Sequence, residues 1–571
     1  MKKSTTPIHA KRIAIAVAAV CASLSMPAVA NENKAMLDLM LKKGVITQKD
    51  YNDFMEANKE ADENKAFKDF RTDKDISTSI KDIQKRQNDG SVKENGFGFK
   101  SKDGNSELNI TGRLHFDNRN LWNEWGDYVD RDSSSLGDRF SVRRARIGAT
   151  GIFNKNINYE VVTNLVGGNA NLLDTAWANY NFRPEAQVRV GRFKQPFGLE
   201  TLMSSNNISF MERSYQDQIA PGKQLGAMFH GEQPNSMTYA ASIYQTGFDP
   251  LSSASGPEAA GRMTINLAKV MSGVGDDVLI HFGAAATSGS YEVVPTTSSQ
   301  SGSTALTKGA FLAFNDEFGG LRNVYRNRIY GSHPCTSSST GALAVCGSTL
   351  ISAAAQEAAK VKQNRFGLEA ALAKGPWKLQ AEFTYADLTA TSRTATSAAG
   401  AFGATTYDTR SSGNTSVGYV ELMYNITGEN WAPTYRSGVV GSIRPNVPFD
   451  LSTMNGTGAW QVGVRYSQFN ASSFASTAGK YKSDGTTGVD SAASGTVVGT
   501  ASYEVEGSPT GNTLTLGVNW LLNPNARIMF NYSRSQFGKA FKPVDIGTVS
   551  SAATNSGDTS QAFMIRSQFN F

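Results

Sequence analysis

The chain has 571 residues and a formal net charge of +6, with 40% hydrophobic and 19% charged residues. After the first thirty residues no apolar run approaches the ~20 residues that a membrane helix needs, so a helical membrane protein is excluded. The chain nevertheless contains 54 Gly, 30 Phe and 19 Tyr, a composition typical of many alternating strands joined by polar connections.

Residues 1–30 are predicted to form a signal peptide. Basic residues precede an apolar run at 13–20, and Ala28-Val29-Ala30 is a cleavage sequence of the A-x-A type. We expect the mature protein to begin at Asn31. The removed segment carries the four positive charges of Lys2, Lys3, Lys11 and Arg12, so the mature chain is near +2 and its net charge identifies no partner.

Residues 31–100 are predicted to form a helical periplasmic extension and linker. Met36, Leu37, Met40 and Leu41 share one helical face, and the pair Thr47 and Asp50 resembles a capping box. The apolar seam suits a coiled coil between protomers. A solvated, partly ordered linker is the alternative.

From about residue 105 the hydrophobic period changes from helical to two. We therefore predict an all-β domain over 101–571, a transmembrane antiparallel β-barrel of about 16 strands, an even number as bacterial barrels require. The predicted strands lie at 107–117, 139–153, 156–167, 171–183, 186–194, 223–231, 235–246, 260–270, 276–288, 363–373, 376–390, 415–427, 459–470, 512–523, 526–534 and 561–571.

The last predicted strand is amphipathic up to the end of the chain. Phe563, Ile565, Phe569 and Phe571 share one face, whereas Arg566, Gln568 and Asn570 share the other. Such a strand suits a barrel that it must close, with lipid on one side and water on the other. An edge strand of a soluble sandwich is the alternative for this stretch alone.

The connections alternate between tight turns and long polar loops. Short turns at one end of the barrel and long loops at the other are typical of outer-membrane barrels. We expect both chain termini at the short-turn, periplasmic end of a barrel in the outer membrane of a Gram-negative bacterium. The long connection 428–458 breaks this alternation, and a miscounted strand there is one explanation.

Alternation predicts that many arginines face the lumen, because a charged residue facing lipid at mid-depth costs roughly 2–4 kcal/mol. On strand 139–153, for example, Val142, Arg144 and Arg146 alternate against Ala145 and Ile147. Guanidinium groups in a polar tube attract anions and match carboxylate and phosphate oxygens. The inward set is Arg113, Arg144, Arg146, Arg189, Arg262, Arg365, Arg465, Arg527 and Arg566.

Acidic residues share the same inward parity, which leaves the selectivity open. Glu160, Glu369, Glu382 and Glu421 also face the lumen, and mixed charges commonly pair across a barrel. A general, weakly selective porin is therefore the alternative to an anion channel.

Several segments resemble the phosphate-selective porin O and P family, in order, over roughly 105–571. They include Phe140 to Gly148 (FSVRRARIG), Val188 to Glu200 (VRVGRFKQPFGLE), Ser209 to Ser214 (SFMERS), and 516–520 (LGVNW) followed by Asn523-Pro524-Asn525. The resemblance implies a homotrimeric barrel of 16 strands in contact with outer-membrane lipid and lipopolysaccharide. It also implies a loop, 195–222, folded into the pore beside Lys194 and Arg213, and passage of small anions such as phosphate or polyphosphate.

The remaining signals point to no other chemistry. Cys335 and Cys346 are expected to form a loop disulfide in an oxidising compartment, with two free thiols as the alternative. We expect no enzyme, cofactor, metal or nucleic-acid partner, because no nucleophile, phosphate-binding or metal-ligand motif is present. A surface adhesin that uses loops 289–362 and 471–511 is the rival from another class.

Overall fold

The computed structural model describes residues 48, 52, 97–101, 103–123, 139–166, 172–233, 236–246, 256–293, 297–300, 303–306, 309–318, 324–329, 359–396, 405–477, 503–541 and 557–571. The predicted signal peptide and both cysteines lie outside these residues. The chain divides into two units, Met1–Val92 and Lys93–Phe571. In the first unit Gln48 and Asn52 are helical, and Gln48 Nε2 donates to Asn52 Oδ1 at 3.2 Å.

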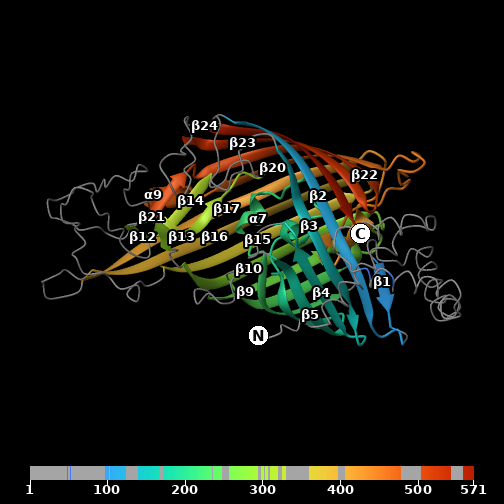
Figure 1. Cartoon of the computed structure of the whole chain (residues 1–571), viewed down its shortest axis with the longest axis horizontal. Coiled ribbons are helices and arrows are strands. Elements are labelled where there is room, and N and C mark those ends of the chain that lie inside the picture. Colours follow the sequence, from blue (N-terminus) through green and yellow to red (C-terminus); the bar gives the residue numbers. More distant parts are fainter. Residues whose placement is uncertain are drawn as a thin grey trace. The chain divides into compact units, whose positions relative to one another are not determined.

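The second unit is a closed antiparallel barrel of sixteen strands among the described residues (Figure 1), which confirms the predicted fold class. Every predicted strand corresponds to one observed strand. These are β2 (Glu107–Asn123), β3 (Arg139–Phe153), β4 (Ile157–Asn164), β5 (Leu173–Arg183), β6 (Ala186–Lys194), β7 (Lys223–Gln233), β8 (Met237–Gln245), β9 (Pro257–Asn266), β10 (Val278–Val293), β15 (Ala359–Lys374), β16 (Trp377–Thr396), β17 (Thr405–Asn425), β20 (Ala459–Asn470), β22 (Thr510–Asn523), β23 (Ala526–Phe541) and β24 (Gly557–Asn570).

The ring closes where the last strand pairs with the first. β24 and β2 run antiparallel from Arg113 opposite Asn570 to Asn123 opposite Ser560. Phe571 exchanges two backbone hydrogen bonds with Gly112, of 2.9 and 3.1 Å. The amphipathic C-terminal strand is therefore a barrel strand with two neighbours, not the edge of a sandwich. A short strand, β1 (Phe97–Lys100), pairs with the start of β2, inside the stretch for which a linker was expected.

Several short helices and strands are present in addition to the sixteen barrel strands. They are α8 (Leu267–Val270), α9 (Ser472–Thr477), the pair β11 (Thr297–Gln300) and β12 (Ser303–Leu306), and the three-stranded sheet of β13 (Gly309–Phe314), β14 (Tyr325–Ile329) and β21 (Tyr503–Gly507). Among the described residues, no helix is long and apolar enough to cross a membrane.

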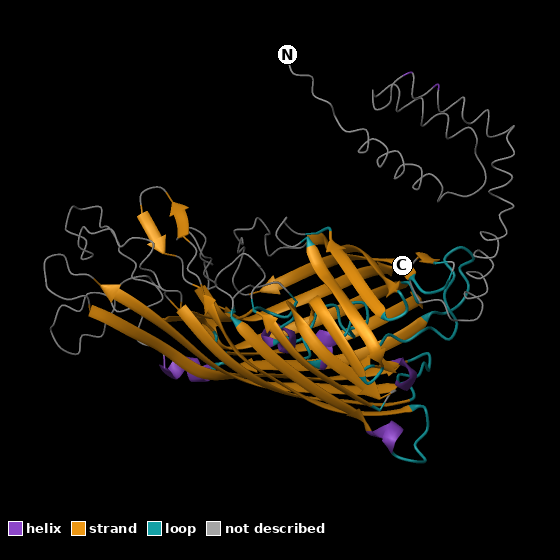
Figure 2. Ribbon diagram, turned by 90° about the horizontal axis from the view of Figure 1, so that it is seen from below, coloured by secondary structure: helices purple, strands orange, loops and turns teal. Residues whose placement is uncertain are grey.

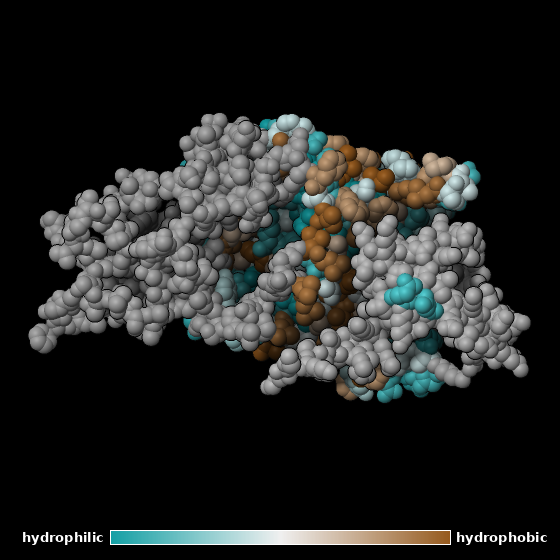
Figure 3. Space-filling model, in the orientation of Figure 1, coloured by the Kyte–Doolittle hydropathy of each residue, from teal (hydrophilic) through white to brown (hydrophobic). Residues whose placement is uncertain are grey.

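Alternation along each strand separates an apolar outer face from a polar inner one. On β22, Leu514, Leu516 and Val518 are exposed on the outside, whereas Thr515 and Asn519 are buried inside. Figure 3 shows hydrophobic side chains gathered on the visible outer surface over β2 and β3. This pattern is that of a barrel whose outer face contacts lipid and whose lumen is polar.

A β-bulge changes the expected parity of β3. His115 pairs with Arg144 and Phe116 with Val142, so Arg143 is an extra residue without a partner on β2. Because a bulge inserts one residue, the alternation shifts by one beyond it. Val142 consequently lies outside, 42% exposed, and the prediction that it shares the inward face of Arg144 is wrong.

The connection 195–222, here called the inner loop, folds into the barrel. It contains two short helices, α6 (Leu199–Leu202) and α7 (Tyr215–Ile219), which lie within the ring of strands in Figure 2. Phe197, Leu199 and Met211 are fully buried. The loop therefore narrows the lumen, as the family resemblance implies.

The connection 428–458, here called the inner turn, is not a missed barrel strand. β17 pairs directly with β20, and the inner turn folds inward between them. It contains a 3₁₀ turn (Ala432–Thr434) and the two-residue strands β18 (Tyr435–Arg436) and β19 (Val439–Val440). Its Trp431, Tyr435, Val440 and Ile443 form one buried cluster with Leu199, Met203, Ile208 and Phe210 of the inner loop.

Candidate functional site

The inner loop is held against one side of the barrel by buried polar contacts. The Glu382 carboxylate on β16 accepts from the backbone N–H groups of Leu199 at 2.7 Å and Glu200 at 2.6 Å. Farther along the loop, Ser209 Oγ donates to Glu421 on β17, and Met211 N–H donates to Asn531 on β23. The loop thus fills the half of the lumen that these strands bound.

A cavity of about 530 Å³ lies between the inner loop and the opposite wall, β2 to β7. Its ionisable lining is strongly biased to one sign, with eight basic side chains and three acidic ones. The basic residues are Arg113, Arg144, Arg146, Arg189, Arg192, Lys194, Arg213 and Lys223, and the acidic residues are Glu160, Asp174 and Asp217. We call this space the basic cavity.

Three of these cations have no carboxylate partner within the described part of the chain. Arg113 Nη1 donates to Ser205 Oγ at 2.9 Å, and Lys194 Nζ donates to the carbonyls of Leu202 at 3.2 Å and Met203 at 2.6 Å. The Arg189 guanidinium lies 4.1 Å from the centre of the Trp177 ring. Among the described residues, none of these three side chains forms an ion pair with a carboxylate.

Three further cavity cations pair with acids of the lining. Asp174 forms ion pairs with both Arg146, at 2.9 Å, and Lys223. Arg213 lies 3.6 Å from Asp217. One carboxylate shared by two cations leaves a surplus of positive charge here as well.

The structure separates the eleven predicted site residues into three groups, the third of which is Arg527 alone. Six predicted site residues, namely Arg113, Arg144, Arg146, Arg189, Lys194 and Arg213, meet at the basic cavity. Arg262, Arg365, Arg465 and Arg566 lie elsewhere, in ion pairs with buried acids. Arg465, for example, contacts Glu200 at 3.1 Å and Glu317 at 2.9 Å. These four residues tie strands and inner segments together.

Arg527 lines a second, smaller cavity of about 230 Å³ between the inner loop and the inner turn. Its Nη1 donates to the Ile208 carbonyl at 3.2 Å and its Nη2 to Gln568 at 2.9 Å. Arg444 of the inner turn lines the same space. Ser204 borders both cavities, so they are adjacent.

Sequence reasoning missed Arg192 and Lys223. Simple alternation places Arg192 on the outer face of β6, whereas Arg189 lies on the inner face. Gly191 lies between them with φ 124°, which side-chain-bearing residues rarely adopt. Arg192, Phe193 and Lys194 all line the cavity beyond that point. The glycine inside a strand pattern was the available signal. Lys223 begins β7, where the inner loop ends, and no pattern marked it.

Burial and charge set the protonation of two inner-loop acids. Burial raises the pKa of Glu200 to about 7, although Arg465 opposes the shift. Burial also raises the pKa of Glu212, but Arg143, Arg119 and Arg566 lower it more, and its pKa lies well below the ordinary value. Glu212 is therefore ionised at neutral pH.

A closed antiparallel barrel with an apolar outer face, a polar lumen and an inward-folded loop defines an outer-membrane channel of the porin class. The model of the family named Phosphate-selective porin O and P matches residues 108–298 and 348–571. The chain belongs to this family, as the sequence resemblance indicated, and is an outer-membrane channel protein.

Several solved structures of outer-membrane proteins are similar to this chain at low identity and low TM-score. OmpT, an outer membrane protein of Vibrio cholerae, is 11% identical with a TM-score of 0.41, over 83% of this chain and 99% of that chain. The anion-selective porin from Comamonas acidovorans is 9% identical with a TM-score of 0.40, over 82% and 100%. The channel DcaP of Acinetobacter baumannii is 9% identical with a TM-score of 0.42, over 83% and 99%. No curated protein sequence matches the chain.

Proposed function

We propose that this protein is a passive diffusion channel for small anions, with phosphate or polyphosphate as the preferred solutes. The observation that carries the proposal is the basic cavity, where Arg113, Arg189 and Lys194 have no carboxylate partner among the described residues. Cations whose charge is not cancelled by a neighbour attract anions from solution.

The chemistry of the lining suits an oxyanion that must enter and leave. Each arginine offers several N–H donors in a planar fork that matches phosphate oxygens. These donors replace part of the water that the anion loses in a narrow lumen. Several weak sites in series, rather than one tight site, allow passage without trapping.

The proposal also covers the assembly and its orientation. We place the short turns and both termini on the periplasmic side, because short periplasmic turns and long outer loops are the rule for such barrels. The exposed apolar outer face supports contact with outer-membrane lipid and lipopolysaccharide. A homotrimer is proposed from the family resemblance alone.

A general pore of weak selectivity is the second candidate. The acids Glu160, Asp174 and Asp217 favour it, because they line the same cavity and attract cations.

The test is the reversal potential of the purified protein in a planar bilayer under a KCl gradient, repeated with sodium phosphate added. Anion preference with chloride current blocked by phosphate is the expected result. Anion preference without such block would reduce the proposal to a general anion channel. Weak or cation preference would establish the general pore, and absence of conductance would favour a surface adhesin built on a barrel.

A further inference from the structure

Glu212 of the inner loop points its carboxylate into a ring of four arginines, here called the arginine ring. Arg119 Nη2 lies 2.6 Å from Oε1 and Arg566 Nη2 lies 3.0 Å from it. Arg143 forms a fork, with Nε 2.9 Å from Oε1 and Nη2 3.1 Å from Oε2. Arg144 Nη2 completes the ring at 3.9 Å from Oε2.

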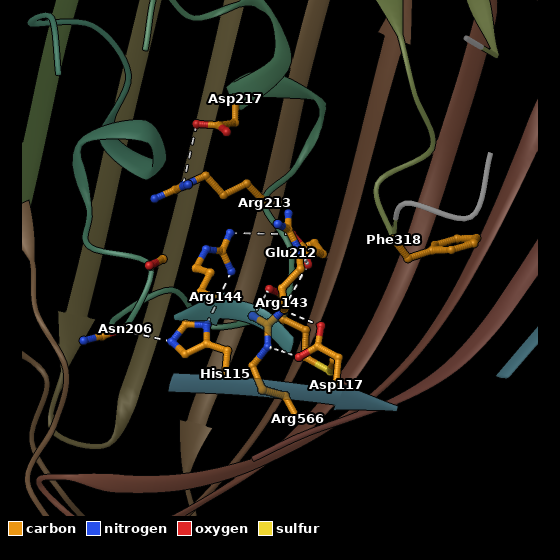
Figure 4. Close-up of polar contacts among 12 residues, drawn as sticks. His115, Asp117, Arg143, Arg144, Asn206, Glu212, Arg213, Asp217, Phe318 and Arg566 are labelled. Atoms are coloured by element: carbon orange, nitrogen blue, oxygen red, sulfur yellow. Dashed lines mark hydrogen bonds and ion pairs between the residues drawn. The ribbon is translucent and has the colours of Figure 1, made fainter. Parts of the chain in front are cut away.

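Three separate features of the barrel bring these four cations together. Arg119 comes from β2 and Arg566 from β24, across the seam that closes the barrel. Arg143 and Arg144 are adjacent in sequence, and both reach Glu212 because of the bulge in β3. Figure 4 shows Arg143 and Arg144 on one side of Glu212, with Asp117 and Arg566 below.

The ring carries more positive charge than its acids cancel. Asp117, the other carboxylate here, is within 2.9 Å of Arg119 and 2.7 Å of Arg566. With Glu212 the group therefore has four cations and two anions. A fork and two further donors converging on one carboxylate form the type of site that binds carboxylate or phosphate oxygens.

The arginine ring adjoins the permeation space. Arg144 both contacts Glu212 and lines the basic cavity. The Arg143 side chain is 42% exposed, whereas the Glu212 side chain is 12% exposed. An anion in the basic cavity thus lies next to a stronger site that the chain's own carboxylate occupies.

We propose that the arginine ring is an oxyanion-binding site whose resident ligand is the Glu212 carboxylate. By filling this site, Glu212 limits how tightly the channel holds a phosphate-class oxyanion and keeps such anions moving. The role of Glu212 in permeation rests on the proposed anion channel, whereas the binding site itself can be tested without ion flow.

The test is isothermal titration of inorganic phosphate into the folded, detergent-solubilised full-length protein and its Glu212→Gln variant. We expect the Kd for phosphate to fall at least tenfold in the variant, because a neutral amide no longer competes for four guanidinium groups. Phosphate should also block the chloride current of the variant at about tenfold lower concentration than it blocks the wild-type current.

The matched control is Glu185→Gln, which removes the same charge from an exposed turn outside the basic cavity and leaves the arginine ring occupied. We expect it to change the phosphate Kd no more than twofold. Addition of Arg143→Gln to Glu212→Gln should abolish the gain. Equal gains in the Glu212→Gln and Glu185→Gln variants, or no gain in Glu212→Gln, would overturn the inference.

If Glu212→Gln does not fold, a second variant that keeps the negative charge can be used instead. Glu212→Asp keeps the carboxylate but withdraws it by one methylene, so it cannot satisfy the Arg143 fork and Arg566 together, and an intermediate phosphate affinity is expected. A wild-type affinity would overturn the inference. Anion selectivity of the wild-type channel is a separate result, so either conclusion can fail while the other stands.

Discussion

Arg566 donates to both carboxylate oxygens of Asp117, 449 positions earlier in the chain, with distances of 2.7 Å from Nε to Oδ1 and 2.8 Å from Nη2 to Oδ2. Both side chains are fully buried. The pair lies on the two strands that close the barrel, β2 and β24. The last strand is therefore joined to the first by a buried ion pair as well as by its backbone ladder.

Arg566→Gln should destabilise the folded barrel by about 3–5 kcal/mol, because it leaves a buried carboxylate with one fewer counter-charge. Guanidinium unfolding of the detergent-solubilised protein, followed by tryptophan fluorescence, measures the loss. The double variant Asp117→Asn/Arg566→Gln should lose less than the sum of the two single variants. Strict additivity would show that the two side chains do not interact.

Glu382→Gln should loosen the first turn of the inner loop. An amide offers one acceptor oxygen where the carboxyl group accepts from both the Leu199 and Glu200 N–H groups, and a buried N–H group left without a partner costs about 1–3 kcal/mol. Amide hydrogen exchange at 199–200 should be faster than in the wild type. Glu185→Gln, at an exposed turn, should leave this exchange unchanged.

Arg113→Gln and Arg189→Gln should each reduce anion preference by roughly fivefold in the chloride-to-potassium permeability ratio. That factor corresponds to an interaction energy of ~1 kcal/mol between two unit charges 4 Å apart in water. Reversal potentials under a KCl gradient measure it. Arg183→Gln removes the same charge from an exposed position at the end of β5 and should leave the ratio unchanged.

The double variant Arg144→Gln/Arg146→Gln should also lower anion preference without unfolding the barrel. Both side chains line the basic cavity, and Arg146 shares its partner Asp174 with Lys223, so Asp174 keeps one ion pair. Reversal potential and far-ultraviolet circular dichroism are the two measurements. Unchanged selectivity in a folded double variant would remove both residues from the anion path.

Stability should fall between pH 5 and pH 8 because of Glu200. Its folded-state pKa of about 7 exceeds the ordinary value of 4.5, so the folded state favours the protonated acid. The stabilising contribution is complete below 4.5 and is lost as the pH rises through 7, by an amount on the order of 3 kcal/mol. Glu200→Gln mimics the protonated acid, so its denaturant midpoint should depend less on pH over this range than the midpoint of the wild type. If the denaturant midpoints of the wild type and the variant changed equally with pH, Glu200 would not be the group responsible.

Trp431→Ala should destabilise the barrel by about 3–5 kcal/mol, the usual cost of truncating a buried aromatic residue. Trp431 is 2% exposed in the inner turn, and Lys378 Nζ lies 4.6 Å from its ring centre. Trp377→Ala is the control, because Trp377 is 51% exposed on the outer face beside Lys378. Equal losses in detergent would show that burial of Trp431 contributes no more to stability than the exposed Trp377.

Alternation of polar and apolar residues along the sequence predicted the strands. The same alternation predicted that many arginines face the lumen. A strand with one face in lipid and one in water must alternate, so the sixteen strands and the family motifs appear without any knowledge of contacts. Where the alternation was interrupted, the predicted face of the neighbouring side chains was wrong. The bulge at Arg143 moved Val142 outside, and Arg192 lines the cavity although simple alternation places it on the outer face.

The sequence by itself determined a barrel of sixteen strands, the family to which it belongs, and a lumen rich in arginine. Tertiary structure alone decided which of those arginines pair with acids and which line the basic cavity. Arg465 and Arg566 look like Arg113 and Arg189 in the linear pattern, but their acid partners lie on strands or inner segments far away in sequence. Ion pairing depends on distance in space, and ring closure and the folded inner loop set that distance.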